Sequence, residues 1–359
     1  MRRILPSLIA LLIVATLSIF QRDLLIDIFS RLREIHPLEV FPLILAGLTM
    51  IVARGLFLKS CSPGVSLRRA IVADQSALSA GYGIALGGGA VGTGLRIHMF
   101  SRWNLRPQTI AASIVATAVL PSFTTWGLPI AVLLPKIARG DGENFETLVV
   151  VIGVTLIVVS AVFWWIALEW TSLFAIVGRI GLRAQRSIQR RLPTRYWRAR
   201  KVIDRAQPEF FTDELRLSLR SLIHHRGVVI LLSSLGTLGA GFFCLLTASH
   251  VFGASGLTVY EALVAFSLIR VLIALSPIPG AAGIAELGLI ALLERAGVST
   301  LDATGTTLLY RFLTWFTPIV VGTVLWWRYS RQRQETTHGT LRDNDSQLED
   351  AGGSLPLHG

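Results

Sequence analysis

Single charged side chains within long apolar runs are the residues of this sequence best suited to chemistry. Glu286 follows a segment broken by proline and glycine, SPIPGAAGIAELGL. A charge at the bilayer centre costs about 2.5–3.5 kcal/mol on insertion scales and usually marks function. Three arginines lie in comparable surroundings, namely Arg96, Arg270 and Arg311. Guanidinium groups bind anionic oxygens in a bidentate geometry and a carboxylate binds cations, so these four residues are candidate substrate-binding residues.

A structural role for Glu286 stays open beside this functional one. Glu286 could pair with Arg270 or Arg311 inside the protein. It could also lie at the start of a helix, where the helix dipole favours a negative charge. The sequence alone does not separate these roles.

Breaks in the apolar runs are the second feature of the candidate site. Pro279, Gly280 and Gly283 precede Glu286, and Gly92 lies in the glycine-rich stretch GGGAVGTG. Proline lacks an N–H, and glycine has unusual conformational freedom, so both interrupt helices. Broken backbone at membrane depth is tolerated only where protein buries it or where it lines a wet cavity. We predict that these four residues belong to the substrate path.

The sequence lacks the residue patterns of metal sites, of common hydrolases and of nucleotide-binding loops. We find no acidic pair with metal spacing, no HExxH and no GxSxG, so no metal, cofactor or catalytic residue is predicted. The stretch GGGAVGTG lacks the Lys-Ser/Thr of a P-loop, which favours a turn or close backbone packing over nucleotide binding. Cys61 and Cys244 lie far apart in apolar sequence and are interpreted as packing thiols. Without an ATP-binding motif, any transport would be passive or ion-coupled.

Composition indicates an all-α polytopic membrane protein. The 359 residues are 52% hydrophobic and 16% charged, whereas soluble domains carry roughly 25% charged residues. Several runs approach the roughly 20 apolar residues that cross a bilayer. The net charge of +12 lies in short segments between these runs, which is the positive-inside pattern. We predict a multi-pass protein of the bacterial cytoplasmic (inner) membrane with both termini cytoplasmic.

Hydropathy and charge divide the chain into six segments. They are an N-terminal span and connector at 1–39, a first repeat with a glycine-rich hairpin at 40–135, a linking span at 136–177, a basic cytoplasmic loop at 178–226, a second repeat with the Glu286 hairpin at 227–328, and a disordered tail at 329–359. A retained first span is favoured over a cleaved signal peptide. Arg54, near the inner end of the second span, can snorkel to the interface.

The two repeats are predicted to have opposite orientations. Each places a broken hairpin between two spans, and the basic segments put the first hairpin inside and the second outside. Inverted-topology repeats with broken helices are typical of secondary transporters, whose site lies near the midplane. We predict that both hairpins are re-entrant. Alternatively, each hairpin could cross the membrane twice, because two crossings leave the other segments on the same sides of the membrane.

The basic loop carries RRLPTRYWRARK, in which aromatic residues lie between arginines. Such a pattern also occurs in nucleic-acid-binding patches. Because this segment connects two spans, we predict that it lies on anionic lipid headgroups and binds no nucleic acid. A partner membrane protein or an oligomer is also compatible with a loop of this size.

The second half of the chain resembles a known family of flippase-like proteins, which are similar to the membrane domain of lysylphosphatidylglycerol synthase. The similar segments are SPIPGAAGIAELGL, ALLERAGVS and LLYRFLTWFTPIVVG. Matching positions are Pro279, Gly280, Gly283, Glu286, Gly297, Arg311 and Gly322, with Gly92 and Arg96 in the first half. Two departures are Ala281, where a second glycine is common, and ASIVATAVLPS, which lacks a charge. The first half therefore has no predicted charge partner.

This resemblance implies movement of a lipid, or of a lipid-linked polar headgroup, between leaflets. Full-length synthases also carry a cytoplasmic aminoacyl-transferase domain, for which these 359 residues have no room, so aminoacyl transfer is not expected. The alternatives are a membrane enzyme or an accessory subunit of phospholipid or polyprenyl-phosphate metabolism. The expected partner is a phospholipid or a lipid-linked substrate.

Overall fold

The structure is a computed structural model. It describes residues 37–83, 88–140, 142, 144–169, 208–254, 256–276 and 281–331. Three predicted features lie wholly or mostly outside these residues: the N-terminal span, most of the basic loop and most of the C-terminal tail.

Long apolar helices dominate the fold. Within the described residues, five helices are long and apolar enough to cross a membrane. They are α3 (Pro37–Cys61), α6 (Pro107–Ala138), α7 (Asn144–Glu169), α10 (Pro208–Val251), and a last helix that starts as α13 (Thr300–Arg311), passes through the π-helical turn η3 (Phe312–Phe316) and ends at Arg331. The predicted class, an all-α polytopic membrane protein, is confirmed.

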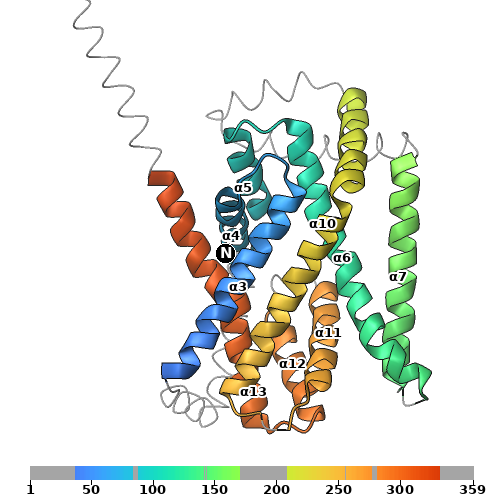
Figure 1. Ribbon diagram of the computed structural model, residues 1–359, viewed down its shortest axis with the longest axis vertical. Helices are drawn as coiled ribbons and strands as arrows, with labels where there is room; N and C mark the ends of the chain where they lie inside the picture. The colour runs from blue at the N-terminus through green and yellow to red at the C-terminus, as the bar shows by residue number, and fades with distance from the viewer. Residues whose placement is uncertain are drawn as a thin grey trace, which may run out of the picture.

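Four shorter helices form two pairs. α4 (Leu67–Gly83) packs against α5 (Gly88–Arg102), and α11 (Val259–Leu275) packs against α12 (Ile284–Arg295). The longest of them, with 17 residues, spans about 26 Å at 1.5 Å per residue, which is less than the roughly 30 Å of a hydrocarbon core. Figure 1 shows the α4–α5 pair toward one end of the bundle and the α11–α12 pair toward the other.

Capping residues explain where two helices of the second half begin. The Thr258 hydroxyl accepts a hydrogen bond from the Glu261 backbone N–H at 3.2 Å, and the Glu261 carboxylate accepts one from the Thr258 backbone N–H at 2.9 Å. This reciprocal capping box begins α11, and such boxes satisfy two otherwise unpaired backbone donors. Ser299 caps α13 through the Asp302 backbone N–H at 3.2 Å.

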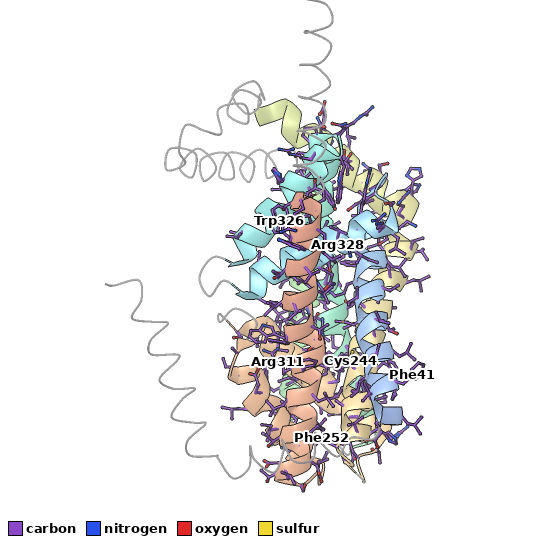
Figure 2. All side chains as sticks on the ribbon, turned by 90° about the vertical axis from the view of Figure 1, so that its left-hand side faces the viewer. Phe41, Cys244, Phe252, Arg311, Trp326 and Arg328 are labelled. Carbon is purple, nitrogen blue, oxygen red and sulfur yellow. The ribbon has the colours of Figure 1, made fainter. Side chains whose placement is uncertain are left out.

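The main hydrophobic core lies where α3, α10 and the second pair of short helices meet the last helix. Among its fully buried members are Ala46, Leu245, Phe266, Ile269 and Leu289. Large apolar side chains also cover the outside of the bundle, where Phe41 points away from the helices in Figure 2. An exposed apolar surface of this extent is typical of a lipid-facing protein rather than a water-soluble one.

Two glycines allow close approach to helix α4. A Cβ atom on Gly92 of α5 would collide with the backbone carbonyl of Ala77, and one on Gly322 of the last helix would collide with that of Gln75. Hydroxyl groups join the same surfaces, since Ser79 Oγ and Thr323 Oγ1 lie 2.8 Å apart. The expected role of the glycine-rich stretch in close backbone packing is therefore confirmed at Gly92.

We expect the substitution Gly322→Ala to destabilise the protein by about 1–3 kcal/mol, the usual penalty of overpacking. The added methyl group would meet backbone atoms of α4, which cannot move as a flexible side chain can. The matched control is Gly236→Ala in α10, where a Cβ would meet no atom within 4 Å. Melting curves of the purified protein in detergent compare the two, and equal melting temperatures would contradict the packing role of Gly322.

Candidate functional site

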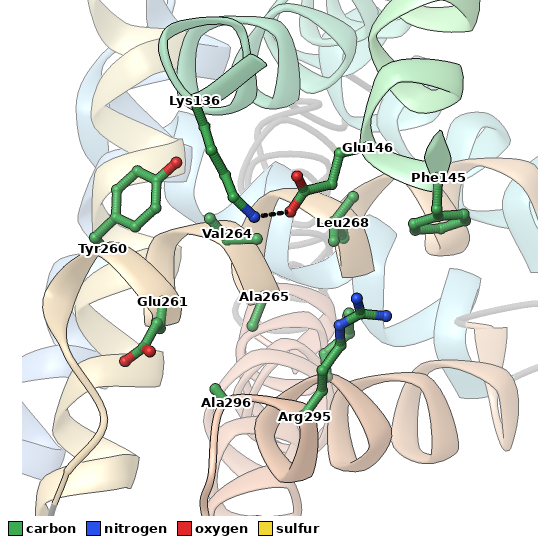
Figure 3. A pocket seen from close by; sticks show the side chains of 11 residues that line it. Lys136, Phe145, Glu146, Tyr260, Glu261, Val264, Ala265, Leu268, Arg295 and Ala296 are labelled. Carbon is green, nitrogen blue, oxygen red and sulfur yellow. Dashed lines mark hydrogen bonds and ion pairs between the residues drawn. The ribbon is translucent and has the colours of Figure 1, made fainter. Parts of the chain in front are cut away.

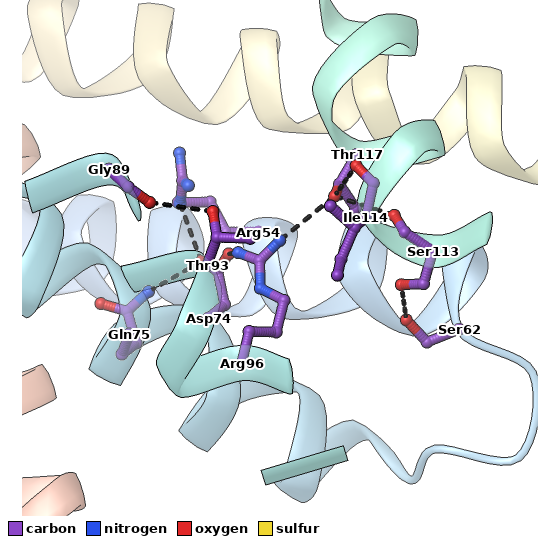
Figure 4. Close-up of polar contacts among 10 residues, drawn as sticks. All are labelled: Arg54, Ser62, Asp74, Gln75, Gly89, Thr93, Arg96, Ser113, Ile114 and Thr117. Carbon is purple, nitrogen blue, oxygen red and sulfur yellow. Dashed lines mark hydrogen bonds and ion pairs between the residues drawn. The ribbon is translucent and has the colours of Figure 1, made fainter. Parts of the chain in front are cut away.

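A carboxylate held by two arginines lies between the first three described helices. Arg54 Nε of α3 donates to Asp74 Oδ2 of α4 at 2.9 Å, and Arg96 Nη2 of α5 donates to Asp74 Oδ1 at 3.1 Å. Only 6% of the Asp74 side chain is exposed, against 25% for Arg54 and 15% for Arg96. Figure 4 shows the two guanidinium groups converging on this carboxylate. Each oxygen of Asp74 thus binds one arginine.

A fourth helix fixes the Arg96 guanidinium from the other side. Arg96 Nη1 donates to Thr117 Oγ1 of α6 at 3.2 Å. The Thr117 hydroxyl itself lies 2.9 Å from the carbonyl oxygen of Ser113, and Ser113 Oγ is 2.5 Å from Ser62 Oγ. A continuous polar network therefore joins α4, α5 and α6 to the α3–α4 connection, which restricts the rotamers of the charged groups.

These charged groups line a cavity of about 240 Å³. Its lining residues are Arg54, Phe57, Asp74, Arg96, Thr117, Pro121, Thr124, Ser234, Thr237, Leu238 and Arg270. The lining side chains come from all of α3, α4, α5, α6, α10 and α11, so the two halves of the chain meet here. Arg270 donates through Nη2 to Thr125 Oγ1 at 3.3 Å. Its guanidinium lies 5.9 Å from the centre of the Phe266 ring.

Among the described residues, two guanidinium N–H groups at this cavity find no hydrogen-bond partner. They are the buried Nε atoms of Arg96 and Arg270. A buried donor without an acceptor carries a desolvation penalty of about 1–3 kcal/mol, and more when it is charged. A ligand with several acceptor oxygens would relieve that penalty, which makes the cavity chemically suited to an anion.

Glu286 and Arg311 form a separate ion pair. Arg311 Nε donates to Glu286 Oε1 at 2.6 Å, and the other carboxylate oxygen accepts from the Gly283 backbone N–H at 2.6 Å. Gly283 has φ of 83° at the start of α12, a left-handed conformation that glycine adopts at little cost. Both structural roles considered for Glu286, an ion pair and a helix-start carboxylate, are thus present together.

The surroundings of Arg311 help to hold this pair. Arg311 is 9% exposed, and its guanidinium lies 5.4 Å from the centre of the Trp315 ring. It directly precedes the π-helical turn η3, and such turns within α-helices often occur at functional sites. Figure 2 shows Arg311 well within the last helix and Arg328 near the C-terminal end of that helix.

A second cavity, of about 210 Å³, opens near the ends of α6 and α7. Lys136 Nζ and Glu146 Oε1 face each other across it at 2.6 Å, with Tyr260 and Arg295 at its edge (Figure 3). Lys136 and Glu146 pair with each other, whereas the cavity around Asp74 also contains Arg270, which forms no ion pair with a carboxylate in the described part of the chain.

The structure thus separates the predicted site residues into two groups. Arg96 and Arg270 line one cavity, whereas Glu286, Arg311 and Gly283 form the other cluster. Gly92 serves helix packing, as described above. Pro279 and Gly280 lie outside the described residues. Their assignment to a substrate path stays a prediction.

Sequence analysis missed two members of the charged cavity. Asp74 lies in LRRAIVADQSALSAGYG, an apolar segment in which an isolated carboxylate is the same kind of signal that singled out Glu286. It supplies a charge partner in the first half, from α4 rather than from ASIVATAVLPS in α6, the segment without a charge. The position of Arg54 in the sequence would allow it to snorkel, but in the structure its guanidinium turns inward to Asp74. An ion pair inside the bundle compensates this charge, so the side chain need not reach the interface.

Comparison with known proteins identifies the family. The family model described as "Lysylphosphatidylglycerol synthase TM region" matches residues 3–322. No curated protein and no solved structure gives a significant match to the chain. The match includes every residue of both charged clusters and of the two short helix pairs. The chain therefore belongs to the family of the lysylphosphatidylglycerol synthase TM region.

Proposed function

We propose that this protein is a flippase-like transporter that moves a lipid, or a lipid-linked polar headgroup, between the leaflets of the membrane. The observation that carries the proposal is the cavity lined by Arg54, Arg96 and Arg270, in which Asp74 pairs with the first two of these arginines. Membership of the family agrees with a membrane-embedded function. No covalent chemistry is needed for this activity, only a polar path through an apolar medium.

The cavity lowers the energetic barrier to headgroup passage through favourable electrostatics. A phosphate taken into hydrocarbon loses its hydration, and an unpaired buried charge is very unfavourable. Guanidinium groups replace that hydration with charge-assisted hydrogen bonds. Hydroxyls at Thr124 and Ser234, which lie 3.0 Å apart, add further polar contacts beside the arginines. The acyl chains would stay in lipid outside the bundle.

The transporter architecture belongs to this proposal. We propose that the two halves are inverted repeats, that α4–α5 and α11–α12 are re-entrant, and that both termini are cytoplasmic in a bacterial inner membrane. Support comes from the short helix pairs at opposite ends of the bundle. The meeting of both halves at one cavity also agrees with sites between repeats.

Orientation is tested by labelling single cysteines in a background where Cys61 and Cys244 are replaced. We expect a cysteine at exposed Arg69 to react with an impermeant thiol reagent from the cytoplasmic side. One at exposed Arg139 should react from the outside, since the two positions lie at opposite ends of the inverted arrangement. Labelling of both from one side would refute the proposed topology.

The function itself is tested in proteoliposomes with fluorescently labelled glycerophospholipids and an impermeant quencher. Wild-type protein should accelerate the loss of inner-leaflet fluorescence, and Arg96→Gln should slow this movement at least about tenfold, because a charged hydrogen bond is worth about 1.5–3 kcal/mol. Arg102→Gln, an exposed position in the same helix α5, is the matched control. If monodisperse wild-type protein moved lipid no faster than liposomes without protein do, transport would be contradicted and an accessory role favoured.

A further inference from the structure

We propose that the cavity lined by Arg54, Arg96 and Arg270 selects a doubly charged terminal phosphate, that of a lipid phosphomonoester, over the singly charged phosphodiester of an ordinary phospholipid. This inference rests on the proposed function and narrows its substrate class. It follows from the charge of the cavity, from its free donors and from the unequal pairing of its arginines.

The formal charge of the cavity favours a dianion. Three guanidinium groups and one carboxylate are the ionised side chains among its lining residues, which leaves a formal charge of three minus one, or +2. A phosphomonoester carries about −1.5 to −2 charges at pH 7 and three strong acceptor oxygens. A phosphodiester carries one negative charge and fewer free oxygens. The monoester therefore neutralises the cavity more completely.

The donors that lack partners match the acceptors of such a group. The Nε atoms of Arg96 and Arg270 are buried and have no hydrogen-bond partner in the part of the chain that the structure describes. Each guanidinium presents its N–H groups in a fixed fork, which suits bidentate binding of phosphate oxygens. The cavity volume of about 240 Å³ is several times the roughly 30 Å³ that one water occupies in the liquid. A phosphate group can therefore enter.

The three arginines of the cavity differ in whether a carboxylate pairs with them. Asp74 binds Arg54 at 2.9 Å and Arg96 at 3.1 Å, so both guanidinium groups are positioned in advance. Arg270 forms no ion pair with any carboxylate in the described part of the chain, and its polar contact is the Thr125 hydroxyl at 3.3 Å. Arg270 thus supplies uncompensated positive charge. Removing it should weaken recognition of the second phosphate charge without leaving a buried anion behind.

Binding to the detergent-purified full-length protein tests this inference separately from transport. The probes are short-chain phosphatidate, short-chain phosphatidylglycerol with the same tails, and inorganic phosphate. We expect wild-type protein to bind phosphatidate at least about tenfold more tightly than phosphatidylglycerol, a difference of about 1.4 kcal/mol. Binding of inorganic phosphate as tight as that of phosphatidate would overturn the lipid assignment in favour of the free anion.

Two variants of Arg270 show whether its charge produces the preference for phosphatidate. Arg270→Gln should reduce the preference for phosphatidate to less than about threefold. Arg270→Lys, which keeps the charge, should retain most of the preference, and so should the exposed control Arg102→Gln. An unchanged preference in monodisperse Arg270→Gln protein would overturn the inference.

The two proposals can fail independently. Equal affinity of wild-type protein for both lipids, together with intact lipid movement, would overturn the phosphomonoester inference and leave the proposed transport standing. A strong preference for phosphatidate without any lipid movement would refute transport and leave the binding site standing.

Discussion

Replacement of Asp74 by asparagine should lower the free energy of unfolding by about 3 kcal/mol. Removal of one partner of a buried ion pair typically costs 3–5 kcal/mol, because it leaves a charge without compensation. Here two guanidinium groups lose their shared carboxylate at once. We take the lower end of the range because 25% of the Arg54 side chain is exposed, and solvent partly screens that charge.

The decrease in the free energy of unfolding of the Asp74→Asn variant can be measured by denaturant titration of the detergent-solubilised protein. Glu294→Gln is a matched control on an exposed carboxylate and should stay within about 0.5 kcal/mol of wild type. The double variant Asp74→Asn with Arg96→Gln should recover part of the loss, since it removes one uncompensated charge. Equal stability of Asp74→Asn and wild type would mean that Asp74 does not hold the arginines in the folded protein.

Replacement of Glu286 by glutamine should destabilise the protein by about 2 kcal/mol. The change removes the charge that neutralises Arg311. Because the Arg311 side chain is only 10% exposed, leaving its charge unpaired lowers the free energy of unfolding substantially. The effect is smaller than at Asp74 because 26% of the Glu286 side chain is exposed. Glutamine can still accept the hydrogen bond from the Gly283 backbone, so the start of α12 should persist.

Melting curves recorded beside a lipid-movement assay decide what Glu286 does. We expect the melting temperature of Glu286→Gln to fall, and a further Arg311→Gln change to restore part of it. Loss of lipid movement at an unchanged melting temperature would contradict this structural role. It would show instead that Glu286 contacts the cationic group of a headgroup.

Much of the architecture was predictable because it depends on local patterns. Apolar runs of sufficient length gave the spans that became α3, α6 and α7. Proline and glycine marked the two short helix pairs. At α10 the pattern is incomplete: the apolar run predicts a span from Gly227, but the helix begins at Pro208. Proline suits the first position of a helix, and a polar helical extension needs no apolar run to form.

The charged cavity was only partly predictable from the sequence. Arg96 and Arg270 were identified as isolated charges, yet their meeting depends on how α5 and α11 are placed in the bundle. Arg54 and Asp74 are 20 residues apart, and the rotation of two helices decides whether they face each other. No local pattern contains that rotation, so a pair of opposite charges in adjacent apolar segments was the only available signal.

The most direct test of the account is an experimental density map of the full-length protein with bound phosphatidate. The central claim is that a lipid phosphate binds between the arginines of the Asp74 cavity. We expect density for the phosphate within hydrogen-bonding distance of Arg96 and Arg270, with the acyl chains leading outward into lipid. Lipid bound solely at the outer surface, with the guanidinium groups still arranged as in the free protein, would contradict it.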